Sequence, residues 1–85
     1  MNVFTPIAFV LINTETGSES NLLKVLKVLK DVDGVVEVYS VYGVYDVIAK
    51  IEADSMDRLK DIVTWRIRRL DNVRSTLTQI VIESA

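Results

Sequence analysis

The sequence predicts an α+β fold of the ferredoxin-like kind, in which a four-stranded antiparallel sheet has two helices on one face. Four segments have the apolar patterns of strands, and two have the periodicity of amphipathic helices. Their order along the chain is β-α-β-β-α-β, which is the order of two facing β-α-β units. A chain of 85 residues has the size of one small domain, so we assign residues 1–85 to a single domain.

The first strand and the first helix are predicted on either side of a polar segment. Residues 4–12 form a nearly continuous apolar run. Thr16 and Glu19 then have the spacing of a capping box, with Ser18 as a rival cap. The helix that follows has one apolar stripe, which consists of Leu22, Val25, Leu26 and Leu29. Gly34 is expected to end this helix, because glycine readily adopts the conformation that follows a helix C-terminus.

The second and third strands, residues 35–42 and 45–53, are predicted to form a hairpin with a two-residue turn. In this prediction Tyr42 pairs with Tyr45, and Gly43 takes the first central position of the turn, where φ is positive. The two tyrosines and the acid that follows them would then lie at an exposed tip.

Charge supports the register of this hairpin. The two-residue turn sets Glu37 opposite Lys50, which is a favourable cross-strand pair. A four-residue loop is expected instead to set Glu37 opposite Glu52, so that two like charges face each other. We therefore predict the register in which Glu37 meets Lys50.

The second helix is predicted to begin at a cap provided by Asp54 or Ser55. Its apolar stripe consists of Met56, Leu59, Ile62, Val63, Ile67 and Leu70. Arginines gather in its last turns, where positive charge complements the helix dipole. Asp71 and Asn72 interrupt the pattern, and residues 73–83 are predicted to form the fourth strand.

Two helices can cover only one face of this sheet. In the predicted register, the face toward the helices carries Val36, Val38, Val47, Ala49 and Ile51. The opposite face still carries Val35, Tyr39, Val41 and Ile48. The first strand and the segment Ile80-Val81-Ile82 of the fourth are apolar on both faces. An apolar patch of this size is unusual on a soluble monomer. We therefore expect two protomers to dimerise through their sheets.

The composition excludes several kinds of chemical site. The chain has neither Cys nor His, which excludes disulfides, imidazole bases and the common zinc sites. A net charge of −2 argues against a general nucleic-acid-binding surface. The apolar run of residues 7–12 is too short to cross a bilayer. We expect a cytoplasmic protein that is not an enzyme, is not bound to a membrane, and has no catalytic residue, metal or cofactor.

Two segments are candidates for ligand binding. The hairpin turn would present backbone amides and a carboxylate to a small polar molecule, and its residues are Gly43, Val44, Tyr45 and Asp46. The fourth strand carries hydroxyls where a purely structural strand often has Val or Ile, and these residues are Ser75, Thr76 and Thr78. Both segments also have a purely structural interpretation, because tyrosines pair across strands and threonine favours strands.

With these features, nearly the whole chain resembles the effector-binding (RAM) domain of the Lrp/AsnC, or feast/famine, transcription regulators. The resemblance is carried by Asp33-Gly34-Val35, by the run from Val41 to Asp46, and by Val73 with the segment from Ser75 to Thr78. It implies sheet-to-sheet dimers that assemble into larger rings, with small effectors, usually amino acids, bound between dimers. It also implies that Gly43, Tyr45 and Asp46 contact the effector, with Ser75, Thr76 and Thr78 as looser candidates.

The regulators of this family carry an N-terminal helix-turn-helix, whereas the present chain enters its first strand by residue 4. We therefore expect a stand-alone module with no DNA-binding domain and no direct DNA binding. The resulting hypothesis is a homo-oligomer that senses a free amino acid between subunits and modulates full-length regulators of the same family. The alternatives are a small dimeric α+β-barrel enzyme and a purely structural oligomerisation module.

Overall fold

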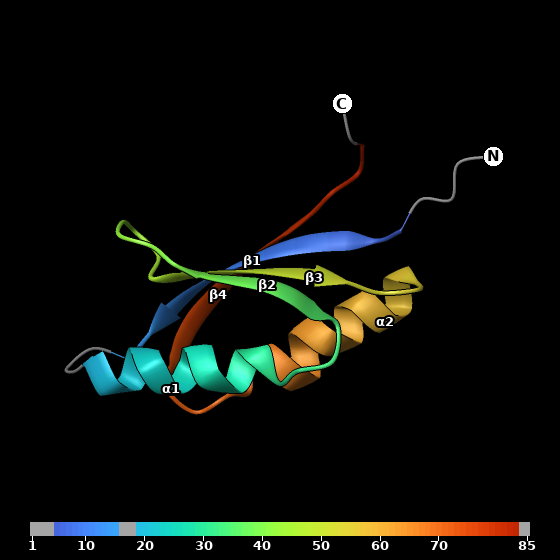
Figure 1. Cartoon of the computed structure of the whole chain (residues 1–85). Coiled ribbons are helices and arrows are strands. Elements are labelled where there is room, and N and C mark those ends of the chain that lie inside the picture. The colour runs from blue at the N-terminus through green and yellow to red at the C-terminus, as the bar shows by residue number, and fades with distance from the viewer. Residues whose placement is uncertain (1–4, 16–18, 84–85) are drawn as a thin grey trace.

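The computed structural model of the chain describes residues 5–15 and 19–83 and confirms the predicted fold class (Figure 1). The elements follow one another in the predicted order. They are β1 (Ile7–Thr14), α1 (Glu19–Lys30), β2 (Val35–Ser40), β3 (Val47–Glu52), α2 (Met56–Asp61), the π-helix η1 (Ile62–Ile67) and β4 (Val73–Ile80). No helix among the described residues is long and apolar enough to cross a membrane.

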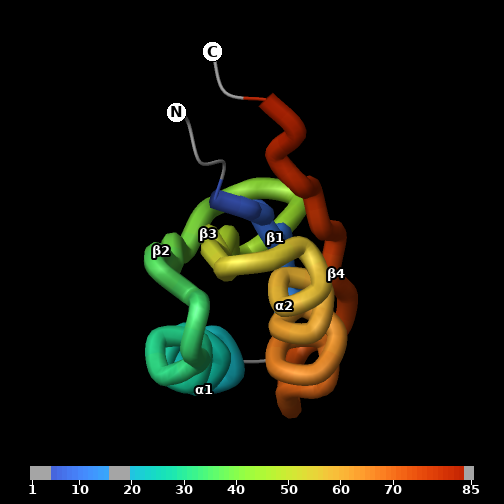
Figure 2. The backbone as a smooth tube through the Cα atoms, turned by 90° about the vertical axis from the view of Figure 1, so that its right-hand side faces the viewer, coloured from blue at the N-terminus to red at the C-terminus, as the bar shows by residue number. Residues whose placement is uncertain are grey.

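The four strands form one antiparallel sheet in the order β2-β3-β1-β4. The helices α1 and α2 lie on the same side of this sheet, as Figure 2 shows in a view along the layers. The strand β1 is therefore central, and β4 is an edge strand that pairs only with β1. The helix α1 lies beneath β2, while α2 and η1 lie toward β4 (Figure 2).

The core lies between the sheet and the helices. Alternate residues of the two central strands have no exposed surface, namely Ala8, Val10, Ile12, Val47, Ala49 and Ile51. The helices add Val25, Leu29, Leu59, Ile62, Val63 and Ile67. Burying one Val, Leu or Ile side chain contributes about 1.5–3 kcal/mol, so this single layer supplies most of the drive for folding.

Only one of the predicted caps for the second helix is used. The Ser55 hydroxyl accepts a hydrogen bond from the Arg58 backbone N–H at 3.1 Å, while Asp54 makes no such contact. The bond satisfies one of the free N–H groups at the start of α2. The predicted caps of the first helix, Thr16 and Ser18, lie outside the described residues.

The periodicity of the second helix predicted one continuous α-helix, and this prediction is wrong. After Asp61 it widens into η1, where the Arg68 backbone N–H donates to the Val63 carbonyl at 3.0 Å. Ile62 and Ile67 are both buried although they are five residues apart. Residues at that spacing lie on different sides of an α-helix, so the wider turn keeps both in the core.

A β-bulge in β2 overturns one prediction about the sheet faces. Val35 pairs with Ile51, whereas Glu37 pairs with Lys50, so β2 has one extra residue between these pairs. The extra residue reverses the alternation of side chains. Val35 therefore packs against the core, and Val36 is exposed rather than facing the helices.

The predicted hairpin register is confirmed, but the two-residue turn is wrong. Glu37 pairs with Lys50, and their side chains form an ion pair at 3.6 Å. The strand β2 ends at Ser40, and β3 begins at Val47. The last backbone hydrogen bond between them runs from the Val41 N–H to the Asp46 carbonyl at 2.8 Å. A four-residue loop follows without shifting the register, and such loops do not need positive φ at the first position.

Positive φ is confirmed at Gly34, which was expected to take the conformation that follows a helix, but the positive φ predicted at Gly43 is wrong. Among the described residues, Gly34 has φ of 99° and Asn72 has φ of 70°, while Gly43 is not in this region. Gly34 stands in the tight connection between α1 and β2, and Asn72 stands directly before β4. The glycine that the backbone geometry requires is therefore Gly34.

The sheet face away from the helices is partly apolar and open. Phe9, Tyr39 and Leu77 are 36%, 50% and 44% exposed on it. Tyr39 donates a hydrogen bond to a Glu37 carboxylate oxygen at 2.7 Å. This bond, together with the negative charge of Glu37, raises the pKa of Tyr39 above its usual value. We refer to this surface, with half-buried Leu11 and Ile48, as the open face.

Candidate functional site

The carboxylate of Asp46 ties the hairpin to the end of β1. Its Oδ2 atom accepts hydrogen bonds from the Thr14 backbone N–H at 3.0 Å and from the Thr14 hydroxyl at 2.8 Å. The Asp46 backbone N–H also donates to the Ile12 carbonyl at 3.0 Å. The other carboxylate oxygen, Oδ1, accepts no hydrogen bond from any residue that the structure describes. Asp46 therefore has a role within the protomer and one free acceptor atom.

The hairpin tip, residues 43–46, projects from the sheet, as Figure 1 shows at its left side. Gly43 and Val44 are exposed, and Tyr45 is half-buried. A Cβ atom placed on Gly43 would have no atom within 4 Å. Among the described residues, the backbone amides of Gly43, Val44 and Tyr45 donate to no backbone carbonyl, whereas that of Asp46 is bound to Ile12.

The strand-four hydroxyls lie on two different faces of the sheet. Thr76 and Thr78 pair with Ile12 and Val10, whose side chains face the helices. Ser75 pairs with Asn13, and the Asn13 side-chain amide donates to the Ser75 hydroxyl at 3.3 Å. Because alternate residues of a strand face opposite sides, the three predicted residues do not form one cluster of hydroxyls.

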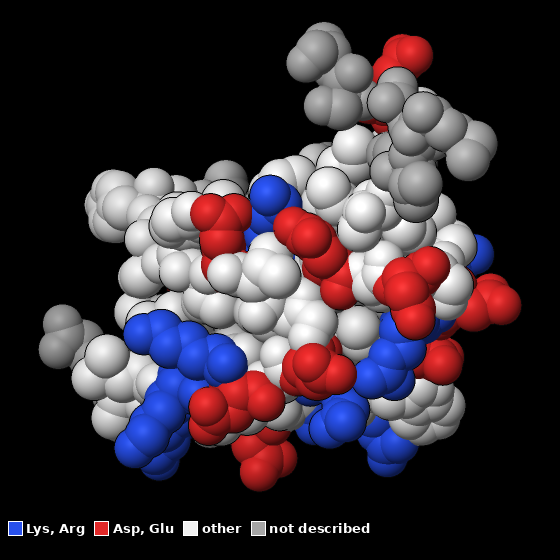
Figure 3. Space-filling view, turned by 45° about the vertical axis from the view of Figure 1, so that its right-hand side comes forward, with Lys and Arg blue, Asp and Glu red and all other residues white. Residues whose placement is uncertain are grey.

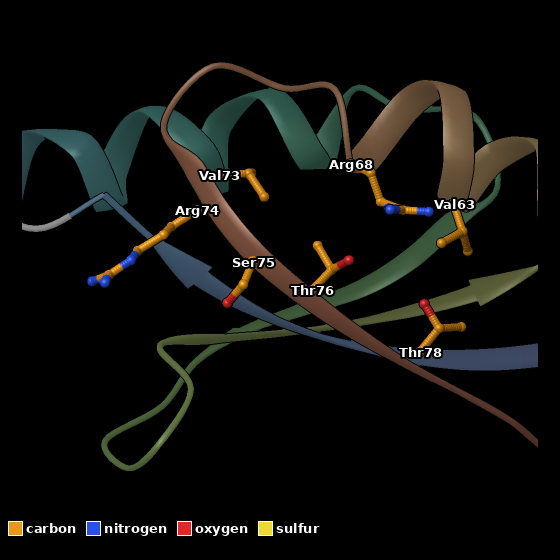
Figure 4. Close-up of a pocket in the computed structure, with 7 residues that line it drawn as sticks. All are labelled: Val63, Arg68, Val73, Arg74, Ser75, Thr76 and Thr78. Carbon is orange, nitrogen blue, oxygen red and sulfur yellow. The ribbon is translucent and has the colours of Figure 1, made fainter.

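A pocket of about 430 Å³ lies between η1 and β4 and includes all three of these residues (Figure 4). Its lining consists of Val63, Arg68, Val73, Arg74, Ser75, Thr76 and Thr78. Thr76 and Thr78 point toward the helix side, and Arg68 reaches toward Val63. Ser75 and Arg74 point the other way, away from Arg68 and Val63.

The two arginines of this pocket were not predicted as site residues. The sequence pattern explains Arg68 as one of several cations that complement the end of a helix. Arg74 stands directly before the predicted hydroxyls, and this proximity is the one signal that the sequence contained. That both residues line one pocket between η1 and β4 is a property of the tertiary structure.

The hairpin tip and the start of β4 lie on opposite sides of β1. Asp46 contacts Thr14 from the β3 side, and Ser75 contacts Asn13 from the β4 side. Neighbouring strands are about 4.8 Å apart, so two strand spacings, about 10 Å, separate the two predicted segments. The structure therefore brings both segments to one end of the sheet without joining them in one pocket.

Charge on the surface is mixed. Figure 3 shows Lys and Arg in small groups with Asp and Glu beside them on the face it presents. Arg69 lies over the Trp65 ring at 5.0 Å from its centre, on the exposed side of η1. Among the described residues, no group of three or more Cys, Asp or Glu side chains has the arrangement of a metal site.

Solved structures with the same fold include proteins of similar length. TTHA0845 from Thermus thermophilus is 30% identical over 94% of this chain and 96% of that chain, with a TM-score of 0.84. The hypothetical protein PHS023 from Pyrococcus horikoshii is 35% identical over 93% of this chain and 92% of that chain, with a TM-score of 0.79. Both consist almost entirely of the domain seen here.

Longer proteins contain the same domain. AsnC of E. coli is 28% identical over 93% of this chain, with a TM-score of 0.81, and this chain spans about half of it (52%). The transcriptional regulator NMB0573 of Neisseria meningitidis, solved as a complex with L-Met, shares the fold at 11% identity and a TM-score of 0.75. The match covers 92% of this chain and 50% of that regulator. No curated protein sequence matches the chain.

The family assignment comes from the sequence model of the Lrp/AsnC ligand binding domain, which matches residues 7–85. This span includes every helix and strand described above. Domains of this kind bind regulatory ligands and are not enzymes, in agreement with the prediction of a non-enzymatic protein. The chain belongs to the Lrp/AsnC ligand-binding domain family.

Proposed function

We propose that this chain is an oligomeric sensing module that binds a free amino acid between subunits. Its membership of a family of ligand-binding domains supports the proposal most strongly. The Neisseria regulator with the same fold was solved with L-Met, which makes amino acids the first class of ligand to test. Proteins that regulate transcription through such a ligand act in the cytoplasm, where we place this chain.

The geometry supports a site that two subunits complete. The ammonium and carboxylate groups of an amino acid are attached to one carbon atom. They cannot reach both Asp46 and Ser75 of one protomer, because β1 lies between these residues. In our proposal the hairpin tip of one subunit therefore faces the β4 start of another.

Each candidate residue has a distinct task in this proposal. The free Oδ1 atom of Asp46 accepts from the ligand ammonium, while Oδ2 stays bound to Thr14. The amides of Val44 and Tyr45, which donate to no backbone carbonyl among the described residues, donate to the ligand carboxylate, and Gly43 leaves room for its approach. The Ser75 hydroxyl of a neighbour supplies a further polar contact, because Thr76 and Thr78 face the helices of their own subunit. A ligand shared by two subunits stabilises the assembly that contains the formed site.

The output of this module is an altered assembly. We propose that the chain dimerises through the open face and that such dimers associate further. Full-length regulators with the same domain are the natural partners, because a mixed interface would use the same surfaces. In this scheme the chain itself does not contact DNA.

Calorimetric titration of the assembled protein with each of the twenty amino acids tests the proposal. We expect at least one to bind, and Asp46→Asn to weaken it about tenfold or more, because hydrogen bonds to charged groups contribute about 1.5–3 kcal/mol. Thr14→Val is the matched control, since it disturbs the same hydrogen-bond cluster but leaves the Asp46 charge. If none of the twenty binds, the sensing function is wrong.

One observation favours a second candidate, a purely structural oligomerisation module. The Asp46 carboxylate already has two partners in Thr14, so the fold alone explains an acid at this position. Such a module would assemble fully without any ligand, and its assembly state would not change when amino acids are added. Sedimentation velocity with and without the twenty amino acids separates the two candidates.

A further inference from the structure

A second pocket adjoins the one between η1 and β4. It has a volume of about 180 Å³ and is lined by Ala8, Leu59, Lys60, Val63, Thr64, Thr78 and Ile80. The two pockets share Val63 and Thr78. Together they form one groove within a single protomer, with a polar end and an apolar end. We call it the η1–β4 groove.

The polar end carries positive charge without a balancing acid. Arg68 and Arg74 line it, and neither pocket has an Asp or Glu in its lining. The salt bridges in the part of the chain that the structure describes involve Lys50 and Arg58 instead. A planar guanidinium group without a partner is well suited to bind a carboxylate through two parallel hydrogen bonds.

Two hydroxyls stand where the sheet faces the helices. Thr76 and Thr78 pair with the buried residues Ile12 and Val10 on the neighbouring strand and face the same side, yet neither threonine is fully buried. Aliphatic side chains at these positions would extend the core, whereas hydroxyls can donate to or accept from a ligand. Figure 4 shows both residues on the same side of β4 as Arg68 and Val63.

The π-helix shapes the opposite wall of the groove. Val63 and Thr64 belong to η1, and Arg68 follows directly after its last residue. Turns of this kind inside helices are frequent at functional sites. Here the wide turn keeps Ile62 and Ile67 in the core while Val63 and Arg68 line the polar pocket.

The apolar end has room for an aliphatic group. Ala8, Leu59 and Ile80 line it, and Val63 continues it toward the arginines. An ammonium group in this groove would lie near Arg68 and Lys60, and neither pocket has a carboxylate in its lining to receive it. Juxtaposed like charges disfavour such a ligand.

We infer that the η1–β4 groove binds a small aliphatic carboxylate that lacks an ammonium group, such as a branched 2-oxo acid. The carboxylate binds Arg68, and the oxo group accepts a hydrogen bond from Thr78. The branched chain lies against Leu59 and Ile80. This site is formed within one protomer and takes a different ligand class from the amino-acid site proposed above.

Titration with 4-methyl-2-oxopentanoate, and with leucine as the matched amino acid, tests this inference. The oxo acid is expected to bind at least about tenfold more tightly to the groove than leucine, because exchanging the oxo group for an ammonium removes a hydrogen bond and adds charge repulsion. Arg68→Gln is expected to weaken the oxo acid about tenfold or more. Thr78→Val should weaken it by a smaller factor.

Arg66→Gln is the control, because Arg66 belongs to the same helix and does not line either pocket. It should leave the affinity for the oxo acid unchanged, and circular dichroism of each variant checks that the fold is retained. Undetectable binding of the oxo acid to the wild-type protein would overturn the inference. An equal loss of oxo-acid affinity in Arg66→Gln and Arg68→Gln would also overturn it. The same holds if the groove binds leucine as tightly as the oxo acid.

Asp46→Asn distinguishes this inference from the proposed function. It is expected to impair binding of the amino acid and to leave binding of the oxo acid unchanged. Loss of oxo-acid binding in Asp46→Asn would place that ligand at the hairpin tip and contradict the groove. Failure of all twenty amino acids, together with Arg68-dependent binding of the oxo acid, would support the groove and reject the amino-acid site.

Discussion

At the scale of single residues, Asp46 combines a structural contact with a predicted binding role. Its Oδ2 atom accepts two hydrogen bonds from Thr14, a buried residue at the end of β1. Without the carboxylate, the backbone N–H and the hydroxyl of Thr14 would lose their partners, and unsatisfied groups in a buried position are costly. The residue therefore anchors the hairpin whether or not a ligand binds.

Asp46→Ala is expected to destabilise the protein by about 2–3 kcal/mol, since hydrogen bonds to a charged group contribute about 1.5–3 kcal/mol. Thr14→Val keeps the backbone N–H donor of residue 14 and should lower the free energy of unfolding by only about 1 kcal/mol. Denaturant unfolding of both variants measures the difference. An Asp46→Ala variant as stable as the wild type would show that this bond does not hold the hairpin.

At the scale of elements, two irregularities decide which side chains face the core. The bulge in β2 brings Val35 to the helices, and the widened turn of η1 keeps Ile62 and Ile67 buried together. Ile62 in turn reaches the connection between α1 and β2. A Cβ atom on Gly34 would lie 2.6 Å from its Cδ1 atom.

Gly34→Ala is expected to destabilise the protein by about 2–4 kcal/mol, because positive φ and overpacking each cost about 1–3 kcal/mol. The Cβ atom would also approach the Glu52 carbonyl at 3.2 Å. Adding Ile62→Val removes the Cδ1 contact and should restore part of the loss in thermal unfolding. Gly43→Ala is the control and should be nearly neutral, since open space surrounds Gly43. Equal effects at the two glycines would refute this account.

At the scale of the whole molecule, one face of the sheet has no covering layer within the protomer. Its exposed apolar side chains, Phe9, Tyr39 and Leu77, come from three different strands. Exposed patches of this kind mark interaction sites. The dimer that we predicted from the sequence would bury this open face, and its formation remains a prediction.

Leu77→Glu should therefore convert the dimer into monomers at micromolar concentration, because it places a charge within the apolar part of the proposed interface. Val28→Glu is the matched control, since Val28 is a similarly exposed apolar residue on α1, away from the sheet. Sedimentation velocity of both variants gives the result. A wild-type protein that sediments as a monomer would contradict the predicted dimer.

Much of the fold was predictable because it depends on local patterns. The element order follows from periodicities, and the hairpin register follows from the pair of Glu37 and Lys50, which the structure contains at 3.6 Å. The turn itself was predicted wrongly at Gly43, because a Gly between two strands does not reveal the length of the loop. The bulge in β2 was also missed, since Val35 and Val36 are the same residue type.

The sequence by itself determined the fold class, the family and the two segments that carry polar chemistry, because these are properties of neighbouring residues and their order. Only the tertiary structure decided that Asp46 binds Thr14, that Ser75 faces away from Thr76 and Thr78, and that Arg68 meets the strand-four hydroxyls. Each of these facts joins residues from different elements. Their distances depend on how β1, η1 and β4 pack, and no local pattern in the chain specifies that packing.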